Sequence, residues 1–226
     1  MNIYLKETEL LNYSNKEIQS LIEKRKWKSL EQLECIKSIY NFVRDEILFG
    51  YNYDDKISAT KVLKDGFGQC NTKGILFMAL LRSCNIPCRI HGFTINKELQ
   101  KGAMTGFVYK NAPNNIFHSW VEVFYNEKWF ELEVFILDKT YLTKLQNLFT
   151  ECNGFFCGYG VGVKDFKNPM DAPCPDFTAR PYACAEDDRH ASWGLTPRGG
   201  RSPAYRGAWF WGFRYIVDIV LRGFRR

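Results

Sequence analysis

A cysteine at the start of an apolar segment and a histidine on an alternating segment are the residues best suited to chemistry. Cys70 lies in Gly68-Gln69-Cys70-Asn71-Thr72-Lys73, and 48 residues later His118 opens His118-Ser119-Trp120-Val121-Glu122-Val123. A cysteine thiol has a pKa of about 8.5, which a helix N-terminus or a neighbouring imidazolium lowers. The pair therefore predicts a thiolate that attacks amides, with His118 as the acid that protonates the leaving amine.

A carboxylate that orients His118 is expected on the strand that follows. Glu133 lies 15 residues after His118, on the returning strand of a hairpin whose turn is Asn126-Glu127. Such a carboxylate can accept from the imidazole and fix its tautomer. Glu131 and Asp138 compete for the role: strand alternation gives Glu131 and Glu133 the same face, and Asp138 lies past the strand.

The other titratable residues near these motifs are not expected to be catalytic. Alternation puts Glu122 with Trp120 on the strand face opposite Ser119, where we expect Glu122 to be solvated rather than catalytic. His91 and His190 are interpreted as structural or incidental.

The elements that must hold these residues are helices first and an antiparallel sheet second, which indicates an α+β fold. Two capping boxes, Ser14 to Glu17 and Ser29 to Gln32, each begin an amphipathic helix. Gly66 and Gly68 let the loop before Cys70 turn tightly and bring backbone N–H groups near the sulfur, where they could hold an oxyanion. The expected elements are helices over 15–27, 30–48, 58–66 and about 70–85, and strands over 88–95, 117–125 and 128–134.

Composition argues against several classes of protein. With 226 residues, 46% hydrophobic, and a net charge of +6, the chain is typical of a soluble basic protein. No Arg/Lys stripe interleaved with aromatics occurs in the first two thirds, so we expect no nucleic-acid partner. The N-terminus carries no secretory signal, which predicts a cytoplasmic location and eight reduced cysteines. There is no Cys-x-x-Cys, and we expect neither a metal nor a cofactor.

Three blocks of sequence resemble the transglutaminase-like superfamily, in its bacterial type, whose papain-like fold carries a Cys-His-Asp triad. The resemblance covers about residues 30 to 145 and implies Cys70 as nucleophile, His118 as base and acid, and Glu133 at the third position. The family usually has Asp where Glu133 stands and Gly where Asn85 stands, and Asn accepts the left-handed conformation. The blocks are Gly68 to Lys73, Ala79 to Arg89, and His118 to Val123 with Trp129 to Glu133.

The resemblance implies a thiol enzyme that acts on amide bonds of peptides or proteins through an acyl-enzyme. It would be a peptidase, an amidase or deamidase, or an acyltransferase, depending on whether water or an amine reaches the thioester. Hydrolysis is favoured over protein crosslinking, because Asp54-Asp55 alone makes a poor calcium loop. The alternative is a non-catalytic module that binds a peptide or protein in a degenerate cleft, which Glu133 in place of Asp favours.

Composition changes abruptly after Lys167. All 18 lysines lie at or before this residue, whereas nine of the 13 arginines follow it. We therefore divide the chain into a transglutaminase-like domain over 1–168 and an Arg/Pro/Trp-rich tail over 169–226. Three interpretations fit the tail: a second structural element, a disordered extension, or a frameshifted or fused translation. We favour the frameshifted or fused translation. Trp209 to Arg226 is too short and charged to span a bilayer but could contact a membrane surface.

Overall fold

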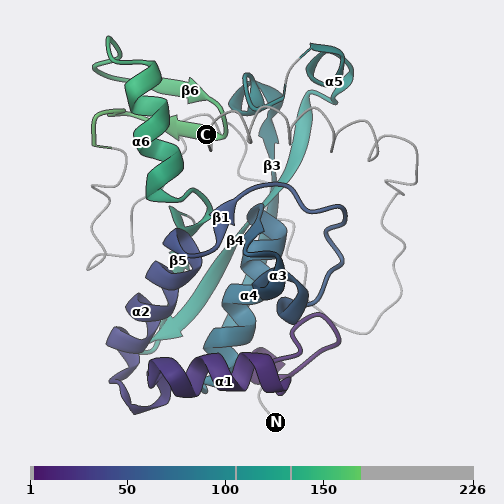
Figure 1. Cartoon of the computed structure of the whole chain (residues 1–226), viewed down its shortest axis with the longest axis vertical. Coiled ribbons are helices and arrows are strands. Elements are labelled where there is room, and N and C mark those ends of the chain that lie inside the picture. Colours follow the sequence, from purple (N-terminus) through teal and green to yellow (C-terminus); the bar gives the residue numbers. More distant parts are fainter. Residues whose placement is uncertain (1–2, 105, 133, 169–226) are drawn as a thin grey trace.

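In the computed structural model, which describes residues 3–104, 106–132 and 134–168, the helices precede the main sheet as predicted (Figure 1). Four helices come first: α1 (Lys16–Arg25), α2 (Gln32–Asp45), α3 (Ala59–Asp65) and α4 (Cys70–Ser83). An antiparallel sheet follows in the order β3 (Cys88–Asn96), β4 (Asn115–Tyr125) and β5 (Lys128–Leu132). The smaller elements are η1 (Ile3–Leu5), η2 (Trp27–Ser29), β1 (Leu48–Phe49), β2 (Phe67–Gly68), η3 (Lys97–Gln100), α5 (Gly106–Asn111), η4 (Val134–Ile136), α6 (Lys139–Leu148), β6 (Phe156–Gly158) and β7 (Val161–Val163).

Helix α4, which is apolar almost all round, lies at the centre of the core. Its residues from Thr72 to Arg82 are all buried. One side packs on the sheet: a Cβ added at Gly74 would lie 3.6 Å from Val121 and 3.8 Å from Ile90. The other sides contact α2 and α3, and α1 crosses its C-terminal end (Figure 1). A helix enclosed in this way is held by apolar burial along its whole length.

The first two helices form where predicted, but their predicted capping boxes are wrong. Asn15, not Ser14, caps α1, and its side chain accepts from the backbone N–H of Glu17 at 3.0 Å. Ser14 instead bonds to Glu7. The hydroxyl of Ser29 donates to the backbone carbonyl of Lys26, the residue just before η2. A short polar side chain takes the nearest backbone or loop partner, which sequence spacing alone does not identify.

The turns around the central helix and sheet have the conformations that their residues predict. Ser58 caps α3, and Gly66 ends it with a φ of 69°. Asn85, which stands where the family has glycine, takes a φ of 60°. Both turn residues of the β4–β5 hairpin, Asn126 and Glu127, have positive φ, as a type I′ turn between antiparallel strands requires.

Residues after the main sheet continue to pack on the core. Phe166 is buried in the same hydrophobic cluster as α4. The hairpin of β6 and β7 contacts the excursion between β3 and β4, where Tyr159 N donates to Lys101 O at 2.8 Å and Gly160 N to Leu99 O at 2.7 Å. The tail over 169–226, its Trp209 to Arg226 segment and His190 lie outside the described residues.

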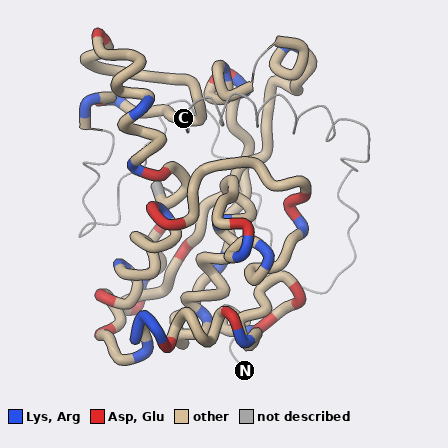
Figure 2. Tube along the Cα trace, viewed as in Figure 1, with Lys and Arg blue, Asp and Glu red and all other residues tan. Residues whose placement is uncertain are grey.

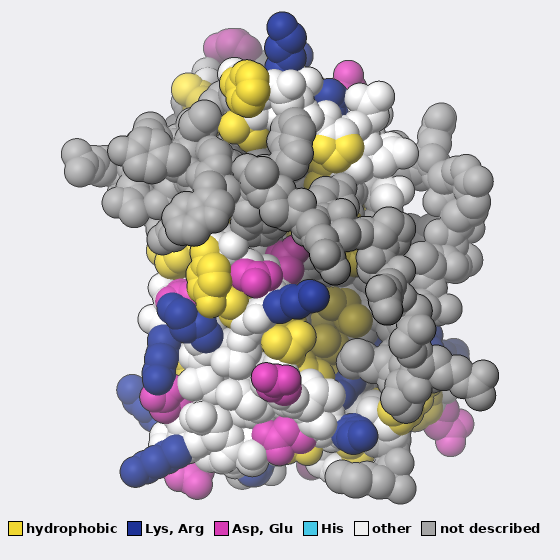
Figure 3. Space-filling view, turned by 90° about the vertical axis from the view of Figure 1, so that its right-hand side faces the viewer, with side chains coloured by type: hydrophobic (Ala, Val, Ile, Leu, Met, Phe, Trp, Pro, Cys, Tyr) yellow, Lys and Arg dark blue, Asp and Glu magenta, His cyan; other side chains and the backbone are white. Residues whose placement is uncertain are grey.

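Charge is mixed over the part of the surface that the structure describes. Figure 2 shows Lys and Arg interspersed with Asp and Glu along the helices. On the face drawn in Figure 3, exposed hydrophobic side chains lie near the middle, with charged side chains of both signs beside them. None of the described helices has the length and apolar character needed to cross a membrane.

Lys73 is the largest fully buried side chain of α4 and an unusual one for a core. Its Nζ donates to the carbonyl oxygens of Ile136 at 2.8 Å and Arg44 at 3.2 Å. Burial lowers the pKa of Lys73 to about 7, and the nearby Asp138 and Asp45 oppose this shift. The lysine therefore joins three segments of chain at the cost of a desolvated amine.

We predict that the free energy of unfolding rises with pH between about 7 and 10 because of Lys73. Over this window the unfolded chain holds a proton on this amine that the folded chain does not, which adds a slope of up to about 1.4 kcal/mol per pH unit. Urea unfolding at pH 7, 8, 9 and 10 should show a shallower slope in Lys73→Met, while the exposed Lys24→Met keeps the wild-type slope. Equal slopes in all three proteins would contradict the prediction.

Candidate active site

Cys70 is the first residue of α4 and is half-buried. The turn before it is closed by Gln69, whose backbone N–H donates to Thr72 Oγ1 at 3.0 Å. Gly68 has no room for a side chain, since a Cβ there would lie 2.6 Å from Thr72 Oγ1 and 3.0 Å from Lys73 Cγ. Glycine at this position therefore permits close packing of the loop on the first turn of the helix.

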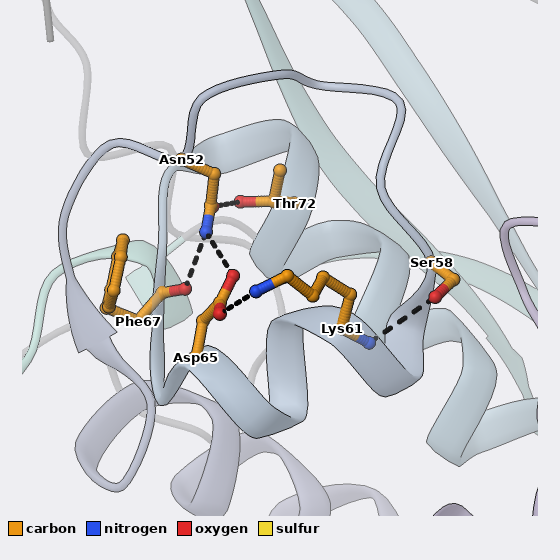
Figure 4. Close-up of polar contacts among 6 residues, drawn as sticks. All are labelled: Asn52, Ser58, Lys61, Asp65, Phe67 and Thr72. Atoms are coloured by element: carbon orange, nitrogen blue, oxygen red, sulfur yellow. Dashed lines mark hydrogen bonds and ion pairs between the residues drawn. The ribbon is translucent and has the colours of Figure 1, made fainter.

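A buried hydrogen-bond network centred on Asn52 holds the start of α4 (Figure 4). Thr72 Oγ1 donates to Asn52 Oδ1 at 2.6 Å, and Asn52 Nδ2 donates to Phe67 O at 3.2 Å and Asp65 Oδ2 at 3.4 Å. The backbone N–H of Asn52 donates to Gln69 Oε1 at 2.8 Å. One asparagine thus satisfies polar groups of the loop, β2 and α4, and fixes the turn that carries the cysteine.

The segment with Asn52 runs beside the turn that carries Cys70. β1 pairs in parallel with β2, and the pairing continues through the bond from Gly50 N to Gly68 O at 3.0 Å. Tyr51 follows, and its hydroxyl donates to Gln100 Oε1 at 2.7 Å. Burial raises the pKa of Tyr51, and the charge of Cys70 raises it further. Tyr51 is thus held between Gly50 and Asn52, which bond to the two residues before Cys70.

The two sequence motifs meet through the residues adjacent to Cys70 and His118. Ser119 Oγ, which is buried, donates to Asn71 Oδ1 at 2.7 Å. Cys70 Sγ also approaches Asn71 Oδ1, at 3.7 Å. The structure thus brings the start of α4 and the centre of β4 together at the predicted place.

His118 is buried, 6% exposed, on the strand face opposite Ser119. It pairs in register with Phe93 of β3, and the two rings meet edge to face with centroids 5.0 Å apart. This contact restricts how the imidazole can turn. The catalytic pairing of Cys70 with His118 remains a prediction.

The carboxylates proposed for the third position have different outcomes. Glu133 lies outside the described residues, so its role remains a prediction. Asp138 caps α6: Oδ1 accepts from Tyr141 N and Oδ2 from Phe49 N, both at 2.8 Å. Both of its oxygens therefore serve the backbone. Glu131 lies opposite Glu122 in the β4–β5 register and is half-buried.

The prediction that Glu122 is solvated is wrong. Glu122 lies on the strand face opposite Ser119, as expected, but only 5% of its surface is exposed. Its carboxylate pairs with Arg89 and with His91 Nδ1, the latter at 3.1 Å, and His91 stacks on Trp120 at 4.4 Å. These partners come from β3, and the register of β3 against β4 cannot be read from one strand's alternation.

Sequence reasoning missed Asn52, Tyr51 and Gln100, because a turn-rich stretch and a link between strands carry no motif around them. Their roles depend on pairing between segments far apart in the chain.

Across the described ranges, no three His, Cys, Asp or Glu side chains gather as a metal ion would require.

We predict that Asn52→Ala destabilises the protein by about 1–3 kcal/mol, because it leaves buried donors and acceptors at the start of α4 unpaired. Urea unfolding measures this loss. The matched control is Lys61→Met, which removes the neighbouring exposed ion pair to Asp65 (Figure 4) and should cost at most about 1 kcal/mol. An equal loss in the two variants would show that the Asn52 network contributes no more to the free energy of unfolding than an exposed ion pair does.

Three comparisons identify proteins that this chain resembles. The family model described as Transglut_core, Transglutaminase-like superfamily, matches residues 20–134, just over half of the chain. The uncharacterized protein YebA of Bacillus subtilis (strain 168) is 37% identical over 62 residues, which cover 27% of this chain and 8% of YebA. A crystal structure from Cytophaga hutchinsonii, provisionally described as a cysteine protease, matches with a TM-score of 0.46 and 18% identity over 60% of this chain and 42% of its own.

Proposed function

Because the chain belongs to the transglutaminase-like superfamily, we propose that it is a cysteine-dependent enzyme acting on amide bonds of peptides or proteins. The observation that carries the proposal is a half-buried thiol at the first residue of α4, where Ser119 Oγ donates to Asn71 Oδ1 and so bonds the start of the helix to β4, the strand of His118. A thiol at the first residue of a buried helix gains from the positive end of the helix dipole. The match covers only 8% of the length of YebA. The activity of a whole protein is therefore also a proposal and does not follow from this match.

The proposed reaction begins when the thiolate of Cys70 attacks the amide carbonyl carbon. The C–S bond forms as the carbonyl π pair moves to oxygen, and the C–N bond breaks when that pair returns. His118 gives the departing nitrogen its proton, and a thioester remains. Glu133, at the family's third position, would hold the imidazole in the required tautomer.

The acceptor that releases the acyl group distinguishes the possible activities. Water gives a peptidase or an amidase, and a primary amine gives an acyltransferase. We propose hydrolysis. A library of glutamine-containing peptides, assayed together for cleavage, ammonia release and amine incorporation, identifies the acceptor and the substrate class in one experiment.

We predict that iodoacetamide at pH 7 alkylates Cys70 faster than any other cysteine. Burial raises the pKa of Cys88 to about 11, and the hydrogen bond with Cys35 raises that of Cys84. A neighbouring imidazolium stabilises the thiolate that iodoacetamide attacks, so His118→Ala should slow the labelling of Cys70 by up to about 30-fold. Mass spectrometry of quenched time points measures the rate at each cysteine.

The control for this experiment is His91→Ala, which removes a histidine of the same sheet that pairs with Glu122 and should leave the labelling rate of Cys70 unchanged. Uniform labelling of all the cysteines in the wild-type protein would contradict a catalytic thiol. It would favour the alternative of a non-catalytic peptide-binding module.

A further inference from the structure

An attack on a carbonyl group also needs a hydrogen-bond donor for the oxygen that becomes negative. The amide nearest to Cys70 in sequence, that of Gln69, is engaged elsewhere. Its Oε1 accepts from Asn52 N, and its Nε2 donates to Asp55 Oδ1 at 2.6 Å. Asn71 presents its carbonyl oxygen, an acceptor, to the sulfur. A side-chain donor for the oxyanion must therefore come from another segment.

Tyr51 is placed to take part. The parallel pairing of β1 with β2 pairs Phe49 with Gly68, and the bond from Gly50 to Gly68 extends it by one step. The next contact runs from Asn52 N to Gln69 Oε1 at 2.8 Å, so the backbone of Tyr51 lies between two residues that bond to the pair preceding Cys70. The influence of the Cys70 charge on the Tyr51 phenol agrees with this placement.

Gln100 completes a donor pair with Tyr51. Its Oε1 accepts the phenolic proton at 2.7 Å, so the NH2 end of the same amide can only donate. If the amide turns over, its NH2 donates to the phenolic oxygen and the Tyr51 hydroxyl becomes the donor. In either arrangement the pair offers an N–H or O–H, and both residues, like Cys70, are half-buried.

The position of Gln100 is held from outside the main sheet. Its backbone oxygen accepts from Met104 N at 2.7 Å, and Gly160 of the β6–β7 hairpin lies close enough that an added Cβ would be 4.0 Å from Gln100 Oε1. A donor fixed before the reaction stabilises charge without reorganisation.

We propose that the Tyr51–Gln100 pair donates a hydrogen bond to the oxyanion that forms when Cys70 attacks a carbonyl group. This inference rests on the proposed function. As the C–S bond forms, the carbonyl π pair moves to oxygen and accepts this bond. When the pair returns and the carbonyl is restored, the bond to the leaving group breaks.

The test compares two reactions of the same sulfur. Acylation by p-nitrophenyl acetate passes through an oxyanion and releases p-nitrophenolate, whereas alkylation by iodoacetamide displaces iodide from a saturated carbon and forms none. Tyr51→Phe and Gln100→Met should each slow acylation of Cys70 by on the order of 100-fold, as expected for one oxyanion donor. Alkylation should remain at the wild-type rate. The double variant should lose little more than either single one, because the two residues act as one unit.

Tyr141→Phe is the matched control. It removes another buried tyrosine hydroxyl, which donates to Tyr159 O at 2.8 Å, and its ring lies beside Phe49. This variant should acylate and alkylate at wild-type rates.

Each other outcome overturns the oxyanion role. Unchanged acylation in Tyr51→Phe and Gln100→Met would exclude it, and an equal loss in both reactions would place the effect on the thiol. Neither result would contradict the proposal that the protein is a thiol enzyme. Rapid alkylation of wild-type Cys70 without any acylation would also leave that proposal intact. Resistance of wild-type Cys70 to both reagents would instead reject the proposed function.

Discussion

The buried hydrogen bonds at the start of α4 are the constraint on which the site depends. The polar groups of Gln69, Thr72 and Asn52 satisfy one another through three hydrogen bonds. Each of these groups would cost free energy if it were buried without its partner. The orientation of Cys70 follows from this closed network, and the apolar burial of the rest of α4 holds the network against the sheet.

Sequence patterns predicted the elements well, because each pattern is local. The apolar surface of α4, the glycine that ends α3 and the two-residue turn of the hairpin depend only on nearby residues. The capping boxes were wrong where Ser14 and Ser29 found other partners. Local spacing indicates that a helix begins but not which competing hydrogen bond is best.

The candidate site was only partly predictable for the same reason. Cys70 and the segment of His118 stand out in the sequence, and the structure joins their neighbours Asn71 and Ser119. The surroundings could not be read: Asn52 reaches α4 through a parallel pairing, and Glu122 is buried by residues of another strand. Contacts set by register between distant segments leave no periodic trace in one chain.

The β6–β7 hairpin lies beyond the residues that the family model matches, yet it supports the excursion that carries Gln100. Tyr159 covers Gly102 so closely that an added Cβ would lie 2.4 Å from its ring. A change in this hairpin can therefore shift Gln100 while the hydrogen bonds that hold the start of α4 stay as they are.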